Sequence, residues 1–412
     1  MRTQQYSRNT DALGRYYTST AVSSLLVEQL PAAKPRAILD LGSGRGALSL
    51  AVSRRWSRSG LVTVDVDAHA NDLEDRLRRK GFRGQHAHFR QDALAPDLAG
   101  LLHASWAGTP EVAVCNPPFI MSRWHDSYSS ILEDVGFSGC LPTIALTDAA
   151  VLFLAQNLRL IAPNGCIAII VPDSLVSAEK YKRFRQELLQ RYMVSRAIRL
   201  PRGSFGGTDA LAHILLVHNK RPRRVSVTLM RLRDNGELTP GLSVNLSQAA
   251  QRLEHDFHAI RCTVGPSVNR LANVIEEVCR GTLNSAQARL AQGLVLHTTD
   301  ITSAMYGHWI DFSGEGFRPP PHTNPQRLAA EGDILVARVG RTASTKVIGV
   351  GRGSVAYSDC LYRIRVPYDW RECVLANLTS AAGRSWLEQH GYGVAARHLT
   401  RSDLLNLPLV IS

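Results

Sequence analysis

The sequence has 412 residues and 44% hydrophobic content, yet it contains no long uninterrupted apolar run. A membrane-spanning helix needs about 20 consecutive apolar residues, so we expect no membrane span. The opening segment, MRTQQYSRNT, lacks the apolar stretch of a signal peptide. The seven cysteines form no C-x-x-C pair, which argues against a zinc ribbon and against a disulfide framework. We therefore expect a cytoplasmic protein that holds no metal ion.

Acidic residues are the scarcer charged type, with 35 Asp and Glu against 48 Lys and Arg and a net charge of +13. This excess fits a polyanionic partner, because Lys and Arg that neutralise phosphates are the generic source of nucleic-acid affinity. GC-rich coding would also favour Arg, which supplies 42 of the 48 basic residues. Residues 1–225 carry 29 basic and 19 acidic side chains and residues 226–412 carry 19 and 16, so the excess lies mostly in the first part.

Short apolar segments alternate with helical patterns in this first part. We expect strands at 38–41, 61–65, 85–89, 112–115, 165–171, 194–200 and 210–217, and helices at 21–30, 47–52, 71–80, 147–161 and 178–191. The alternation implies right-handed crossovers and a mainly parallel sheet covered on both faces, which is an α/β fold. Ligands of such sheets bind beyond the carboxyl ends of the strands.

A glycine-rich turn follows the first of these strands, with Asp40, Gly42, Gly44 and Gly46 in the pattern D-x-G-x-G-x-G. Glycines let the backbone turn sharply and approach a ligand closely. The carboxylate of Asp40 would repel a pyrophosphate, but it can pair with the ammonium group of S-adenosylmethionine. The alternative interpretation is a turn that only packs a helix on a strand.

Asp65 and Asp92 follow the next two strands, so we expect them on the same rim of the sheet as Asp40. Asp65 can accept hydrogen bonds from both ribose hydroxyls of the donor, and Asp92 from its adenine amino group. Asp67 is the alternative to Asp65. Three acids spaced along one rim favour a methyl-donor site over a purely structural turn.

A second motif, Asn116-Pro117-Pro118-Phe119, directly follows the strand at 112–115. An aromatic amine is a poor nucleophile because its lone pair is delocalised into the ring. The side-chain oxygen of Asn116 and the carbonyl of Pro117 can accept both amino hydrogens and so favour a pyramidal nitrogen. Phe119 offers a face on which an extruded base can stack. The motif predicts methyl transfer to an exocyclic or amide nitrogen, and the alternative is a strand that two prolines stop.

Phe205 lies in a glycine-flanked loop between two expected strands. It can close the other side of a base pocket, or it can be an ordinary turn aromatic. The segment Lys220-Arg221-Pro222-Arg223-Arg224 closes the α/β pattern and indicates a domain boundary.

We divide the chain into a first domain at 1–225, a connector at 226–253 and a second domain at 254–412. The second domain has short strand-like pieces, such as 332–340 and 347–350, and helical patterns at 266–280, 371–379 and 382–390.

Residues 12–220 resemble the γ-class amino-methyltransferases of DNA, through LGSGRG, then NPPF, and then GCIAIIVPDSLV and RGSFGGTDALAHILLV. The segment GRYYTS is similar to that family's G-x-[YF]-[YF]-T-[PS], which lines the methionine part of the donor and so points to Tyr17 and Thr18. Ser19 and His213 depart from the commoner Pro and Thr. The resemblance implies a Rossmann-like class I methyltransferase domain, S-adenosylmethionine as cofactor and adenine N6 as acceptor.

Residues 254–412 resemble one target-recognition domain of type I restriction specificity subunits, through GDILVARVGR, SDCLYRI and the closing LTSAAGRSWLEQHG and RHLTRSDLLNLPLVIS. This resemblance implies a smaller α+β domain that reads double-stranded DNA and carries a helix that packs on partner subunits. Arg338, Arg341 and Lys346 are candidates for DNA contact, and solvated surface charge is the alternative for each. Since one such domain reads about half of a two-part site, a palindromic target would require a homodimer.

The sequence therefore predicts a sequence-specific DNA adenine-N6 methyltransferase that flips its base, in a bacterial restriction-modification or phage-defence system with a restriction or defence partner protein. One alternative is an RNA or protein-glutamine N-methyltransferase. The guanine-N2 enzymes among these usually continue NPPF with His-x-Gly, whereas this chain continues with Ile120-Met121-Ser122. Another alternative is a DNA-binding specificity component that is inactive without a partner.

Overall fold

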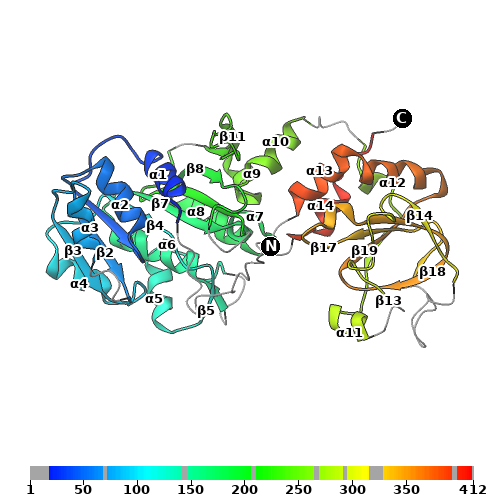
Figure 1. The fold of residues 1–412 in the computed structure, drawn as a ribbon, viewed down its shortest axis with the longest axis horizontal. Helices are drawn as coiled ribbons and strands as arrows, with labels where there is room; N and C mark the ends of the chain where they lie inside the picture. Colours follow the sequence, from blue (N-terminus) through cyan, green and yellow to red (C-terminus); the bar gives the residue numbers. More distant parts are fainter. Residues whose placement is uncertain are drawn as a thin grey trace, which may run out of the picture. The chain divides into compact units, whose positions relative to one another are not determined.

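The structure, a computed structural model, describes residues 18–67, 72–141, 146–205, 210–223, 225–263, 269–290, 295–314, 328–391 and 397–410. The chain forms two compact units, Met1–His255 and Asp256–Ser412, each with its own main sheet. Figure 1 shows the elements of both. Among the described residues no helix has the length and apolar character to cross a membrane.

The first unit is built on a nine-stranded sheet in the order β11-β10-β8-β9-β7-β4-β1-β2-β3. Neighbours pair in parallel, except that β9 runs antiparallel to β7 and β8, and β11 antiparallel to β10. This mainly parallel sheet with intervening helices confirms the predicted α/β class. The strands are β1 (Ala37–Leu41), β2 (Gly60–Asp65), β3 (His86–Arg90), β4 (Val112–Cys115), β7 (Cys166–Pro172), β8 (Met193–Arg199), β9 (Ala212–His218), β10 (Ser226–Arg231) and β11 (Leu242–Asn245).

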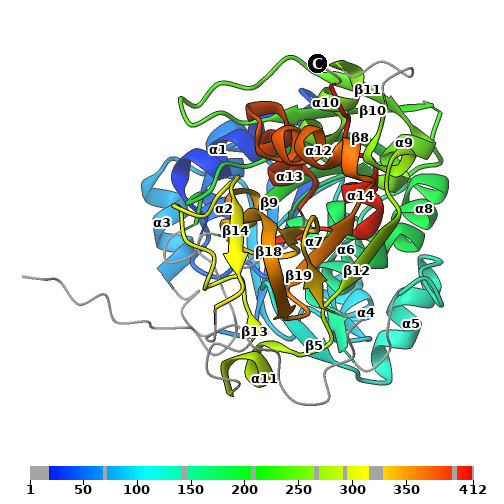
Figure 2. The same ribbon diagram turned by 90° about the vertical axis from the view of Figure 1, so that its right-hand side faces the viewer.

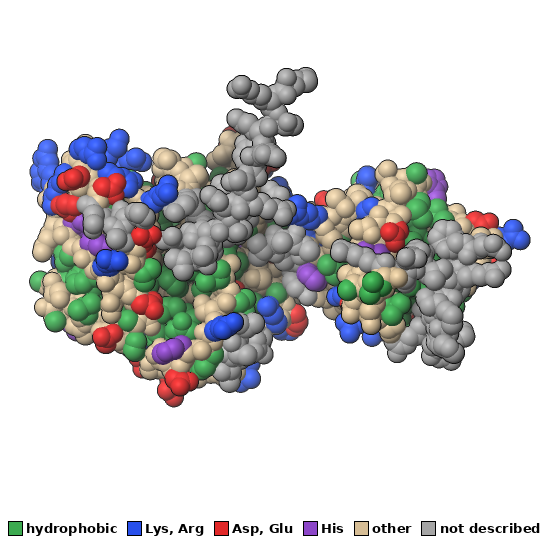
Figure 3. Space-filling model, turned by 60° about the horizontal axis from the view of Figure 1, so that its bottom comes forward, with side chains coloured by type: hydrophobic (Ala, Val, Ile, Leu, Met, Phe, Trp, Pro, Cys, Tyr) green, Lys and Arg blue, Asp and Glu red, His purple; other side chains and the backbone are tan. Residues whose placement is uncertain are grey.

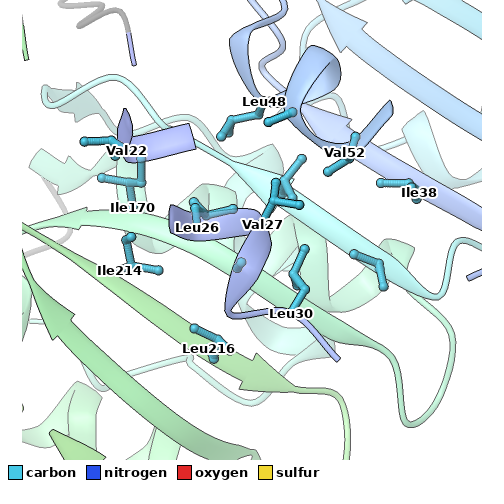
Figure 4. Close-up of a cluster of buried hydrophobic side chains, with 14 of the residues drawn as sticks. Val22, Leu26, Val27, Leu30, Ile38, Leu48, Val52, Ile170, Ile214 and Leu216 are labelled. Carbon is cyan, nitrogen blue, oxygen red and sulfur yellow. The ribbon is translucent and has the colours of Figure 1, made fainter. Parts of the chain in front are cut away.

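Helices cover this sheet on both faces, and the central strands β1, β4 and β7 are accordingly buried along their whole length. On one face, Val22, Leu26 and Val27 of α1 pack with α2 against strand residues that include Ile170 and Ile214, as Figure 4 shows. Buried residues of α3 belong to the same cluster. The helices of this unit are α1 (Thr20–Glu28), α2 (Ala47–Arg55), α3 (Leu73–Arg79), α4 (Leu98–Ser105), α5 (Ser127–Asp134), α6 (Ala149–Leu160), α7 (Asp173–Ser177), α8 (Lys182–Arg191) and α9 (Leu246–Gln251). A short ladder, β5 (Met121–Arg123) with β6 (Leu146–Asp148), follows the NPPF segment.

Residues 226–253, expected as a connector, hold β10, β11 and α9, which extend the first unit's sheet. β10 pairs in parallel with β8, and α9 begins with an Asn245 capping box. The guanidinium of the fully buried Arg185 donates to the backbone oxygens of Ala250 and Gln251. These bonds fix the end of α9 to α8, so this stretch is folded together with the first unit.

The second unit contains a sheet in the order β12-β19-β16-β18-β13, with β14 and β15 also paired to β18. Its strands are β12 (Glu277–Arg280), β13 (Val295–Leu296), β14 (Trp309–Phe312), β15 (Ala329–Ala330), β16 (Ile334–Ala337), β18 (Val347–Tyr357) and β19 (Leu361–Arg365), beside the short pair β17 (Val339–Gly340) and β20 (Arg397–His398). The helices α12 (Arg371–Thr379), α13 (Ala381–His390) and α14 (Arg401–Leu405) lie together at one end of these strands (Figure 2). The unit also has α11 (Ser285–Leu290), and α10 (His255–Thr263) begins at its boundary.

The helix expected at 266–280 is wrong over the described residues 269–280, of which only Leu271–Asn273 form a short 3-10 helix. Residues 277–280 form β12, which pairs antiparallel with β19. Val278 is buried whereas Glu277 and Arg280 are not, and sheet pairing with β19 prevails over the local helical pattern. The helices expected at 371–379 and 382–390 are confirmed as α12 and α13.

Candidate active site

The glycine turn after β1 adopts backbone angles that favour glycine. Gly42, Gly44 and Gly46 have φ of +76°, +50° and +74°. A Cβ on Gly46 would come within 2.4 Å of Leu73, so this glycine lets α2 start against α3. A Cβ on Gly44 would meet nothing within 4 Å. Gly44 is therefore the position of the turn that opens on free space.

The polar residues expected at strand ends do lie along the carboxyl edge of the sheet. Asp40 is in β1, Asp65 ends β2, Asp92 follows β3 and Asn116 follows β4. The Gly44 N–H donates to Asp65 Oδ2 at 2.7 Å, which ties the turn to the next strand. The Leu94 N–H donates to Asp92 Oδ1 at 2.9 Å. Asp65 is buried and Asp92 is exposed.

These side chains share one cavity of ≈ 380 Å³ at this edge, a volume within the range of about 300–1,000 Å³ for small-molecule sites. Of the residues that the sequence predicted, the cavity is lined by Thr18, Asp40, Gly42, Gly44, Asp65, Asp92, Asn116 and Pro118. Gly46, Pro117, Phe119 and Phe205 are not among its lining residues. Tyr17 lies outside the described residues.

Several lining residues were not predicted from the sequence. Val66 and Ile120 are large apolar side chains that are 51% and 36% exposed. Val66 follows Asp65, and Ile120 comes four residues after Asn116. Their closeness in sequence to these polar residues could have predicted that they line the cavity. Phe153 and Tyr128 come from α6 and α5, and only the fold brings them to the cavity. The apolar walls suit a flat ring, and the acids suit hydroxyl and ammonium groups.

Burial and a neighbouring charge raise the pKa of the Asp40 carboxyl. Desolvation of the buried carboxyl raises its pKa to about 7, although the hydrogen bond from Ser49 Oγ, at 2.5 Å to Oδ2, opposes the rise. The negative charge of Asp65 raises this pKa further. Among the described residues, Asp40 Oδ1 is buried without a hydrogen-bond partner. A cationic group placed in the cavity would offset both the desolvation and the repulsion between the two acids.

The acceptor motif is held from behind by the start of α1 and by the Phe205 loop. Asn116 Nδ2 donates to Thr18 Oγ1 at 2.9 Å. Thr18 also forms an isolated antiparallel bridge with Phe205. The ring of Phe205, only 2% exposed, meets the half-buried Phe119 edge-on, with centroids 5.9 Å apart and planes at 72°. Phe205 thus supports Phe119, and its own ring faces the core.

The three candidates for DNA contact in the second unit differ in their hydrogen bonds and exposure. Arg338 Nε donates to the backbone oxygen of Asp359 at 2.7 Å, and its guanidinium lies 3.8 Å from that residue's carboxylate. Lys346 Nζ donates to the backbone oxygen of Ile301. Arg341 is exposed. No group of three or more His, Cys, Asp or Glu within the described ranges is arranged to hold a metal ion.

The cavity residues fit S-adenosylmethionine. The buried Asp40 carboxyl suits its ammonium group, and Gly44 leaves room for close approach of the ligand to the backbone. Asp65 offers carboxylate oxygens for ribose hydroxyls, while Val66 and Phe153 offer apolar surface for the adenine ring.

Comparison with known proteins finds methyltransferases and restriction proteins. The sequence profile described as N-6 DNA Methylase matches residues 3–261. The Defense against restriction protein B of Escherichia phage P1 is 31% identical over 129 residues, which are 28% of this chain and 6% of that protein. The Type I restriction enzyme MpnII methylase subunit of Mycoplasma pneumoniae is 26% identical over 138 residues, which are 32% of this chain and 25% of that subunit. This chain therefore spans a quarter or less of the length of these two relatives.

A tRNA1(Val) (adenine(37)-N6)-methyltransferase of Shewanella pealeana is 25% identical over 253 residues, 57% of this chain and 90% of that enzyme. Among solved structures, the type IIG restriction endonuclease BpuSI has a TM-score of 0.53 and 14% identity, over 97% of this chain and 59% of its own. The type IIL restriction-modification enzyme MmeI has a TM-score of 0.54 and 10% identity, over 94% and 64%. At such low identity these two structures speak for the fold alone.

The predicted Rossmann-like class I methyltransferase fold and the predicted cofactor, S-adenosylmethionine, are both confirmed. The profile match covers more than half of the chain and includes the glycine turn, the strand-end acids and NPPF. This chain belongs to the N-6 DNA methylase family.

Proposed function

We propose that this chain is a sequence-specific DNA adenine-N6 methyltransferase of a bacterial restriction-modification or phage-defence system. The observation that carries the proposal is the shared cavity: Asn116 and Pro118 line the same space as Asp40 and Asp65. Asn116, one of the two groups suited to an amino group, therefore borders the same cavity as the acids suited to the donor. The MmeI structure, whose fold is similar over 94% of this chain, is a complex with DNA.

In the proposed mechanism, bound S-adenosylmethionine supplies an electrophilic methyl group on a positively charged sulfur. The side-chain oxygen of Asn116 and the carbonyl of Pro117 accept the two amino hydrogens of an extruded adenine and direct its nitrogen lone pair toward the cavity. Phe119, backed by Phe205, stacks on the base. Catalysis then consists mainly of alignment and charge placement by these residues.

The second unit is proposed to read the DNA sequence. It has its own sheet and core, so its loops can vary without disturbing the methyltransferase unit. Arg341 is the strongest of the three candidates for DNA contact because its side chain is exposed, whereas Arg338 and Lys346 are half-buried. A palindromic target would need two copies of the chain, and a separate restriction or defence protein would be the further partner.

Methylation of adenine N6 in RNA is the second candidate. The observation in its favour is the tRNA-modifying relative, of which the match covers 90%. That match covers 57% of this chain, whereas the restriction enzyme structures match along nearly its whole length. The structural similarity to restriction enzymes includes the second unit, and this favours DNA over RNA as the substrate.

The test is expression of the full chain in a host without DNA adenine methylation. Mass spectrometry of nucleosides from plasmid DNA and from total RNA should find N6-methyladenine in the DNA, and single-molecule sequencing should place it in one motif. Asn116→Ala should abolish the signal, while Asn116→Asp, which keeps an oxygen acceptor, should retain part of it. Methyl groups found in RNA only, or on another base, would refute the proposal.

A further inference from the structure

Three basic loops are joined at the amino edge of the sheet, the edge opposite the cavity. They precede β1, β2 and β3 and contain Lys34, Arg58 and Arg83. Backbone hydrogen bonds connect them: Gly60 N–H donates to Arg36 O at 2.8 Å, and Arg83 N–H donates to Ser57 O at 2.7 Å. The Ser59 hydroxyl adds a bond to Pro35 O at 2.6 Å.

The helices that end at this edge add further cations. Arg54 lies in the last turn of α2, and Lys80 directly follows α3. All five side chains, Lys34, Arg54, Arg58, Lys80 and Arg83, are exposed, and none forms an ion pair or a side-chain hydrogen bond with any other residue in the described ranges. We call these five residues the basic edge. Figure 3 shows Lys and Arg side chains gathered over the end of this unit where Figure 1 places α2, α3, β2 and β3.

Local structure explains only part of this charge. A cation in the last turn of a helix is stabilised by the helix dipole, which accounts for Arg54 and Lys80. Lys34, Arg58 and Arg83 lie in loops and have no such reason. Two neighbouring acids are already paired, Glu111 with Arg36 at 2.8 Å and Glu74 with Arg78 at 2.7 Å. Self-repulsion among cations on one edge disfavours the fold, and an external anion would relieve it.

The spacing of the three loops fits a polymer of phosphates. Adjacent strands lie about 4.8 Å apart, so the loops before β1 and β3 are separated by about 10 Å. Duplex DNA carries a phosphate charge about every 1.7 Å of helix axis when both strands are counted, so a surface about 10 Å wide faces several phosphates. The acids Asp40, Asp65 and Asp92 lie at the opposite edge, which makes the two edges of the sheet electrostatically unequal.

We propose that the basic edge is a second, sequence-independent binding surface for the phosphate backbone of duplex DNA. This assignment of the basic edge rests on the proposed function, in which DNA is the substrate. Because it lies across the sheet from the cavity, it holds a segment of DNA other than the one whose adenine is flipped. Holding a second segment keeps the enzyme on long DNA between target sites and lets it transfer from one segment to another.

The test uses the full chain and a 30-base-pair duplex of G·C pairs only, which contains no adenine to methylate. The variant Arg54→Gln/Arg58→Gln/Arg83→Gln should bind this duplex about tenfold more weakly at 0.1 M salt. The slope of log K against log salt should fall by up to about 2.7, at about 0.9 for each phosphate that is no longer neutralised. The control Arg183→Gln/Arg221→Gln/Arg223→Gln removes the same charge from other exposed arginines of the unit and should lower the slope by less than about 1. Arg221 and Arg223 lie in the loop before β10, at the same edge of the sheet but five strands away from β1, so this control tests whether the charge must lie beside β1, β2 and β3.

Methylation separates this proposal from the proposed function. Turnover on a short duplex with one target should be unchanged in the basic-edge variant, while the rate on plasmid DNA with few targets should fall about three- to tenfold. An unchanged salt slope in the basic-edge variant, or an equal loss of duplex affinity in the control variant, would refute the proposed binding surface. A loss of affinity for RNA but not for the G·C duplex would overturn its assignment to DNA. Absence of DNA methylation by the unmodified chain would refute the proposed function and leave the duplex-binding result standing.

Discussion

Thr18 and Asn116, 98 positions apart, are joined by a hydrogen bond in which Asn116 Nδ2 donates to Thr18 Oγ1 at 2.9 Å. Thr18 precedes α1, whose N-cap, Ser19, accepts a bond from Val22 N–H, so its place is fixed by the helix. The bond takes up one side of the Asn116 amide. It therefore orients the amide oxygen, the group proposed to accept a hydrogen from the substrate amine.

Thr18→Val should lower kcat for methyl transfer about tenfold, since it keeps the shape but removes the hydroxyl that orients Asn116. Thr18→Ser, which keeps the hydroxyl, should restore most of the rate. The affinity for S-adenosylmethionine, measured by calorimetry, should change less than threefold in both variants.

The opposite outcome is equally informative. If Thr18→Val weakens donor binding and leaves the single-turnover rate at saturating donor unchanged, Thr18 is a donor-binding residue, as its sequence segment suggests. The orienting role would then be wrong.

Gly44 and Gly46 form a matched pair within the turn, because both have left-handed backbone angles. An added Cβ would clash with Leu73 at Gly46 but would meet nothing within 4 Å at Gly44. Gly46→Ala should lower the free energy of unfolding by about 2–3 kcal/mol, through backbone strain and a clash with Leu73. Gly44→Ala should cost about 1 kcal/mol and should instead weaken donor binding, since its methyl group enters the cavity. Chemical denaturation and calorimetry of both variants check this division. Equal effects of the two on donor affinity would refute it.

The positions of the strand-end acids were predictable from the sequence because they depend on local signals. An apolar run that ends in a carboxylate marks a strand and its edge, and parallel strands bring such edges together. Asp40, Asp65 and Asp92 accordingly share one cavity. Phe153 and Tyr128 carried no comparable signal, since α6 and α5 reach the cavity only through the sheet order and the packing of helices.

Long-range pairing also explains what the sequence misassigned. Residues 226–253 were expected to be a connector, yet β10 is paired to β8 in parallel. Residues 277–280 fit a helical period, yet β19 recruits them as a strand. Phe205 was expected either to close a base pocket or to be an ordinary turn aromatic, and its ring lies in the core, beside the bridge to Thr18. In each case a partner distant in the sequence decides the outcome.

Arg185→Leu should destabilise the first unit by about 2–4 kcal/mol, because four backbone oxygens, those of Leu175, Ala178, Ala250 and Gln251, lose their donor. Its exposed neighbour, changed as Arg183→Leu, should have an effect within about 0.5 kcal/mol. Thermal unfolding measures both. Limited proteolysis should show earlier cleavage near α9 in Arg185→Leu only, and equal cleavage in the two variants would contradict the anchoring of residues 246–251 through Arg185.

Asp40 should make both stability and donor binding depend on pH near neutrality. Its pKa in the folded protein is about 7, well above the ordinary value of 3.8, so the folded state binds this proton more tightly than the unfolded state. The stability that the protonated carboxyl contributes is complete below about pH 4 and is lost as the pH rises to 7. Asp40→Asn removes this dependence and should raise the Tm of the ligand-free protein by a few degrees at about pH 8, with a smaller gain at about pH 5.

Donor binding should follow the opposite pH course, because the ammonium group of S-adenosylmethionine pairs with the ionised carboxylate. Below about pH 7 the affinity should fall by up to about tenfold per pH unit, and binding near pH 7 should release a proton. Calorimetry in two buffers of different ionisation enthalpy measures that proton, and Asp40→Asn should bind the donor weakly at every pH. A donor affinity that is constant between about pH 5.5 and 8, with no proton released, would show that Asp40 does not pair with the ammonium group.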